Sequence, residues 1–132
     1  MNARSALLIL LGLVIGVLGT VFAMKALGDR NPMPHAVMTV MGHHMGALGQ
    51  AVKTKQCDAA QANDHLLRLQ STASDIAAAF PGAEQDFLDH GGRLRTALQD
   101  AVQAHPTDCA SLATAIKPVG EACKSCHEQY RD

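Results

Sequence analysis

The chain has 132 residues, enough for one modest domain, and only 17% of them are charged. Eleven basic and twelve acidic residues give a formal net charge of −1, so there is no basic field and nucleic acid is not expected as a partner. The motifs of nucleotide-binding proteins and serine hydrolases are absent, which leaves those classes without support. Aromatic residues make up 3% of the chain, so either alanine-rich helical packing or a bulky cofactor fills the core.

The first predicted element is an uncharged, apolar stretch at residues 6–24. As a helix it would span roughly 28 Å, about the thickness of one hydrocarbon core. Two interpretations remain open, an uncleaved anchor and a secretory signal cleaved near Val21-Phe22-Ala23. The apolar part of a secretory signal runs about 7–15 residues, so the length favours the anchor. Both interpretations export the rest of the chain.

This stretch also sets the expected domain division. We assign residues 1–24 to a signal anchor or transmembrane segment and residues 25–34 to a linker. Pro32 and Pro34 stiffen the end of that linker and lead into a helix. Residues 35–132 form the single exported domain.

Four amphipathic helices are expected in that domain, at residues 35–53, 59–80, 83–105 and about 108–130. Apolar residues recur at spacings of three and four in each, which is typical of a helix with one buried face. In the first helix these residues are Met38, Met41, Met45, Leu48 and Val52. Four such helices joined by short loops predict an all-α fold, an antiparallel up-down-up-down four-helix bundle.

Helix ends are marked by residues with known roles. Pro81 and Gly82 end the second helix. Thr107 or Asp108 is the expected N-cap of the fourth. Pro118 lies inside the fourth helix and predicts a kink there.

Residues 123–127 read CKSCH, which is the C-x-x-C-H attachment sequence of c-type haem. Two thiols one helical turn apart, Cys123 and Cys126, can reach the two vinyl groups of one haem. The adjacent His127 can then supply the proximal ligand of the iron. The motif therefore predicts one covalently bound haem c.

Two other interpretations of the motif are weaker. A redox-active C-x-x-C pair should open a helix, where the helix dipole lowers the thiol pKa, whereas this pair closes one. A zinc site would need further ligands, and Cys57 and Cys109 are far away in the sequence.

Only five residues follow the motif. A four-helix chain that ends in CKSCHEQYRD resembles the class II cytochromes c, the cytochrome c′ family. The resemblance covers residues 33–132 and is strongest in AVMTVMGHHMGALGQAVK and IKPVGEACKSCHEQYR. It implies that haem lies inside the bundle and is bound through the last helix.

The sixth position of the iron faces the first helix in such a bundle, because the start of that helix and the end of the last lie together. In the resembled family, low-spin members carry Met there and gas-binding members carry an apolar residue. The resemblance places Met38 at this position, opposite His127. Met41, an open site, and His43 or His44 remain as alternatives.

The partner of the haem propionates is left open by a departure from the family. Members often carry an Arg near the start of the first helix, where this chain reads Met33-Pro34-His35. Arg131, four residues past His127, is the candidate, and the alternative is a solvated terminal charge.

The remaining cysteines are Cys57, between the first two helices, and Cys109, at the start of the fourth. Both fall at the end of the bundle opposite the haem, in a compartment that permits disulfides. A Cys57–Cys109 bridge would close a loop of about 50 residues and add roughly 4 kcal/mol to the free energy of unfolding. Two free thiols are the alternative.

Taken together, these features predict a c-type cytochrome, not an enzyme, that carries single electrons through a haem ligated by His127 and Met38. The expected location is the inner membrane, single-pass with the haem domain in the periplasm, or a soluble periplasmic protein after cleavage. Membrane or periplasmic redox proteins are the expected partners, and a homodimer is left open. A gas-binding haem protein and a haem-free structural bundle are the alternatives.

Overall fold

The computed structural model describes residues 3–28 and 31–131, and within them all regular structure is helical. The chain divides into two compact units between Pro32 and Met33. The helices are α1 (Ala3–Gly28), α2 (Met33–Thr54), α3 (Ala59–Ala73), α4 (Ile76–Ala79), α5 (Gln85–Gln103) and α6 (Cys109–Tyr130). The first unit contains α1 alone, and the second contains the other five.

Helix α1 is the candidate membrane segment. Its residues Leu7–Leu27 are long and apolar enough to cross a bilayer, and none of that span is buried against protein. The helix is longer than the expected apolar stretch because good helix formers, Ala26 and Leu27, continue it to Gly28. Helix α2 in turn begins at Met33, since Pro34 falls in the first turn, where its missing N–H leaves no bond unmade.

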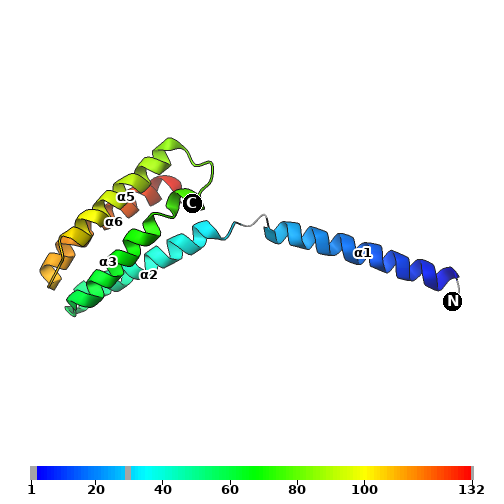
Figure 1. The fold of residues 1–132 in the computed structure, drawn as a ribbon, viewed down its shortest axis with the longest axis horizontal. Coiled ribbons are helices and arrows are strands. Elements are labelled where there is room, and N and C mark those ends of the chain that lie inside the picture. The colour runs from blue at the N-terminus through cyan, green and yellow to red at the C-terminus, as the bar shows by residue number, and fades with distance from the viewer. Residues whose placement is uncertain (1–2, 29–30, 132) are drawn as a thin grey trace. The chain divides into compact units, whose positions relative to one another are not determined.

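The four long helices of the second unit pack in a closed ring. Helix α2 contacts α3, α3 contacts α5, α5 contacts α6, and α6 returns to α2. Figure 1 shows the α2–α3 pair and the α5–α6 pair, each running side by side. The largest fully buried side chains lie inside this ring: Leu48, Leu66, Leu69, Leu98, Leu112 and Val119. Burying each contributes about 1.5–3 kcal/mol to the free energy of unfolding.

The second helix expected from the sequence, at residues 59–80, is interrupted. Helix α3 ends at Ala73, where the Ser74 hydroxyl and the Ser74 N–H both donate to the carbonyl oxygen of Ser71. A serine that bonds nearby backbone groups competes with the helical pattern. The chain then makes the single turn of α4, which buries Ile76 and Ala79 against the core.

Side-chain caps fix where α3 and α6 begin. Asp58 accepts a hydrogen bond from the Gln61 N–H at 2.8 Å. Asp108 accepts from the Ser111 N–H at 2.8 Å and forms a capping box with that residue, so the expected N-cap at Asp108 is confirmed. Helix α6 continues through Pro118 without ending.

Candidate functional site

A cavity of about 290 Å³ lies inside the ring of helices. Helices α2 to α6 all contribute to its wall, which is apolar apart from two histidines, His90 and His127, and the thiols of Cys123 and Cys126. Ligand-binding cavities are typically concave and mostly apolar, with a few convergent polar groups. This cavity has those properties.

A wider hollow of about 550 Å³ adjoins it. The two share five wall residues: Met38, Gly42, Phe87, Cys126 and His127. The wider hollow is more polar, since His35, Tyr130 and Arg131 lie on its wall. The site therefore has an apolar inner part and a polar outer part.

The three residues of the C-x-x-C-H motif occupy the last two turns of α6 and all line the inner cavity. Cys123 and Cys126 are free thiols. Burial raises the pKa of Cys123, helped by the neighbouring Cys126, and burial also raises the pKa of Cys126. A redox-active pair typically has a lowered thiol pKa, which is opposite to the direction that burial favours here.

The zinc interpretation also lacks support. Among residues 3–28 and 31–131, no group of three or more His, Cys, Asp or Glu side chains is placed to hold a metal ion. The two thiols therefore have no set of protein partners that would complete a zinc site.

The methionines of α2 take different positions in the site. Met38 is half-buried and lines both hollows, as does His127. Met41 is 5% exposed and lines only the inner cavity, as does Met45. Of the three, Met38 alone lies where the apolar and polar parts of the site meet.

Two glycines of α2 leave gaps beside the methionines on its wall of the cavity. Gly42 follows Met38 by one turn, and Gly46 follows Gly42 by another. A Cβ built on either would meet nothing within 4 Å. A side chain at Gly42 or Gly46 would therefore project into open space that a flat group can fill.

The other residues singled out from the sequence differ in whether they line the two hollows. Arg131 lies on the wall of the wider hollow. Its backbone N–H donates a hydrogen bond to the His127 backbone carbonyl at 3.1 Å. His43 and His44 line neither hollow of the site. Cys57 and Cys109 lie at disulfide geometry with 5.2 Å between their Cα atoms, and they too line neither hollow.

His90 is a polar wall residue that the sequence did not single out. His90 is only 8% exposed, and its Nε2 lies 3.2 Å from Oε1 of Gln129. The Gln129 amide also reaches Asp86 at 3.4 Å, so α5 and the end of α6 are joined there. The spacing of His90 from Phe87 and Leu94, three and four residues, was the available signal.

These residues fit a haem bound through α6. The cavity is apolar, α2 presents bare glycine positions to it, and two thiols and an imidazole converge on one wall. The polar outer hollow suits the propionate groups.

Comparison with known proteins bears on the same region. Residues 33–131 match the family model described as cytochrome c′. Cytochrome c-554 of Cereibacter sphaeroides is 32% identical over 117 residues, covering 74% of this chain and 76% of that protein. Cytochrome c-556 of Agrobacterium fabrum is 33% identical over 129 residues, covering 86% of this chain and 85% of that protein. The crystal structure of cytochrome c′ from Rubrivivax gelatinosus superimposes with a TM-score of 0.65 at 20% identity. The superposition covers 75% of this chain and 91% of the Rubrivivax gelatinosus chain, and at this identity it shows a similarity of fold.

Proposed function

The chain belongs to the cytochrome c′ family, and on that premise we propose that it is an electron carrier with one covalent haem c, not an enzyme. Haem supplies an iron that alternates between the ferrous and ferric states. Cys123 and Cys126 hold the haem through thioether bonds, and His127 is the proximal ligand. The observation that carries the proposal is the convergence of these three side chains on one apolar cavity.

Met38 is the proposed sixth ligand. Met38 and His127 both line the two hollows, which supports this assignment, whereas Met41 is enclosed in the core and lines only the inner one. His/Met ligation raises the reduction potential of haem iron. It also keeps the iron six-coordinate in both oxidation states, which suits electron transfer.

The outer hollow is the proposed place of the propionates. Arg131 provides a positive charge on its wall, and His35 is a second donor from α2. His35 occupies the region in which the family often carries an Arg, so the two residues together take over that role.

The remaining proposals concern the fold and the location. The ring of packed helices supports an antiparallel up-down-up-down bundle, and the 5.2 Å Cα separation supports a Cys57–Cys109 disulfide. Helix α1 supports an inner-membrane anchor that keeps the haem domain in the periplasm, near membrane or periplasmic redox partners. A second copy of the chain is a further candidate partner.

A gas-binding function is the second candidate. The open space at Gly42, one turn from Met38, would admit a small ligand once the methionine moves away. That function requires an open or easily displaced sixth site, whereas electron transfer requires a retained one.

Two measurements test the proposal on the full-length protein. A haem stain after denaturing electrophoresis should be positive, and a blank lane would contradict haem attachment. The absorption spectrum of the ferric protein should be six-coordinate and low-spin. A five-coordinate, high-spin spectrum would favour gas binding instead.

A further inference from the structure

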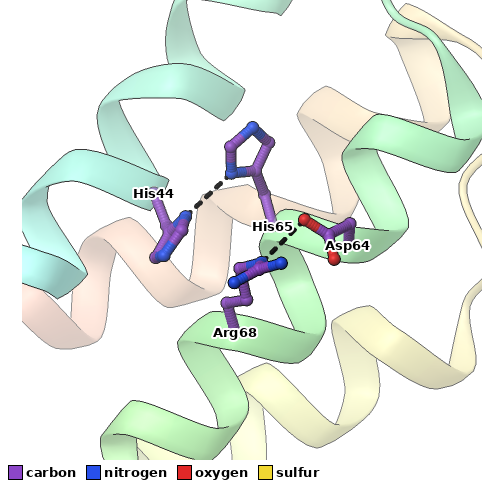
Figure 2. Close-up of polar contacts among 4 residues, drawn as sticks. All are labelled: His44, Asp64, His65 and Arg68. Carbon is purple, nitrogen blue, oxygen red and sulfur yellow. Dashed lines mark hydrogen bonds and ion pairs between the residues drawn. The ribbon is translucent and has the colours of Figure 1, made fainter.

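Two histidines outside the haem site face each other across helices α2 and α3. The Nδ1 atoms of His44 and His65 lie 2.8 Å apart (Figure 2). Both side chains are half-buried, and neither lines the two hollows of the haem site. The proposed function therefore leaves this pair without a role.

The contact requires that one of the two Nδ1 atoms carry a free lone pair, of the kind that binds metal ions. One Nδ1–H donates and the other Nδ1 accepts, so at least one ring is neutral. Burial lowers the pKa of His44, and the nearby His65, His43 and Arg68 lower it further, with only Asp64 opposing them. The neutral imidazole, which is the form that ligates metals, is thus favoured at neutral pH.

The separation of the two nitrogens, which is a hydrogen-bond distance, also matches one coordination geometry. An imidazole nitrogen binds a divalent transition-metal ion at about 2.0 Å. Two imidazole nitrogens that bind one ion at right angles therefore lie about 2.8 Å apart. Tetrahedral angles would spread them to about 3.3 Å. Square-planar or tetragonal geometry with nitrogen and oxygen ligands is typical of Cu²⁺ and Ni²⁺.

We propose that His44 and His65 form a binding site for one Cu²⁺ or Ni²⁺ ion, coordinated by their two Nδ1 atoms. The ring that donated the hydrogen bond moves its proton to Nε2 through solvent, so no oxidation or reduction takes place. Within the described residues no third His, Cys, Asp or Glu completes the set, and water fills the other positions. The ion would join α2 to α3.

The surroundings bear on the charge of the bound ion. Asp64, one residue before His65, holds Arg68 in an ion pair at 2.7 Å (Figure 2). Apart from the histidines, Arg68 is the cation among the described residues that lowers the pKa of His44. Its pairing with Asp64 neutralises that charge. A divalent ion therefore meets no unpaired Arg among these neighbours.

His43 provides a matched control on the same helix. Its ring centroid lies 5.1 Å from that of His44 and 6.4 Å from that of His65, but it takes no part in their hydrogen bond. The His43 side chain is exposed. Its removal should leave the two ligating nitrogens in place.

The experiment titrates copper(II) chloride into the full-length, haem-loaded ferric protein, followed by calorimetry and electron paramagnetic resonance. One ion per chain should bind, with splitting from two nitrogens. His44→Gln and His65→Gln, which keep a polar side chain, should each weaken binding by at least about tenfold. His43→Ala should leave the affinity unchanged. Binding that survives both glutamine variants, or that falls equally in His43→Ala, would overturn the proposal.

A second readout keeps the test valid if a variant is less stable. Nickel(II) chloride should raise the Tm of the wild-type protein, because an ion that binds only the folded chain stabilises it. The same addition should leave the Tm of His65→Gln where it was. An equal rise in both proteins would contradict the site. Neither measurement depends on the sixth ligand of the haem, so its outcome is separate from that of the proposed function.

Discussion

The three methionines on the apolar stripe of α2 occupy different positions in the site, although their spacing in the sequence follows one pattern. Met38, Met41 and Met45 share the apolar stripe, and spacing alone treats them as equivalent. The structure separates them, because Met38 lies where the inner and outer hollows meet and Met41 is enclosed. The C-x-x-C-H residues, which line the cavity, could be singled out from the sequence because their spacing is local. His90 and His65 could not, because their roles depend on partners from other helices.

Gly42 tests whether the bare wall of α2 makes room for haem. Gly42→Leu places a side chain in space that is open in the cavity. We expect the fraction of chains carrying haem to fall severalfold, measured by the ratio of haem absorbance to protein. Gly49→Leu is the control, because Gly49 also has open space at its Cβ but lines neither hollow. Equal haem loading in the two variants would show that the wall has no such role.

His90, whose imidazole is buried on the cavity wall, tests whether a residue other than Met38 binds the iron. His90→Phe replaces the imidazole by a somewhat larger aromatic ring that cannot bind the iron, and it removes the bond to Gln129. The free energy of unfolding should fall by about 0.5–1.5 kcal/mol, the net contribution of one hydrogen bond, because the exposed Gln129 loses His90 but keeps its contact with Asp86. Denaturant titration measures this, and the low-spin spectrum should be retained. A change to high-spin would identify His90, not Met38, as the sixth ligand.

At the scale of helices, elements set by local signals were predicted well. The apolar periods located the four long helices, and Asp108 marked the start of α6 through its cap. The break after Ala73 was missed, because the competing hydrogen bonds of Ser74 leave no trace in the apolar period. The same break positions Ile76 on the cavity wall, so a local irregularity shapes the site.

The proposed Cys57–Cys109 bridge would link the α2–α3 connection to the start of α6. Replacing both residues by Ser should lower the free energy of unfolding by roughly 4 kcal/mol and leave the haem spectrum unchanged, because the bridge lies outside the haem site. Each single replacement should cost as much as the double. Thiol titration of the denatured wild-type haem protein should find no free thiol, and a count of two would show that the bridge does not form.

At the scale of the whole molecule, the chain combines an apolar N-terminal helix with a helical unit that matches the cytochrome c′ family. Helix α1 has the length and composition of a membrane span. An anchored protein should keep its first residues and sediment with membranes. N-terminal sequencing of the mature protein measures this directly, and a sequence that begins at or just after Met24 would establish cleavage instead.

The central claim is that one chain holds haem between His127 of α6 and Met38 of α2 for electron transfer. Its most direct test is the absorption spectrum of ferric Met38→Ala, with Met41→Ala as the control. Met38→Ala should keep its haem, since attachment rests on Cys123 and Cys126, but it should become five-coordinate or water-bound and high-spin, with a lower reduction potential. Met41→Ala should lose about 2–5 kcal/mol of stability and stay low-spin. A Met38→Ala protein that keeps the wild-type spectrum would contradict the account.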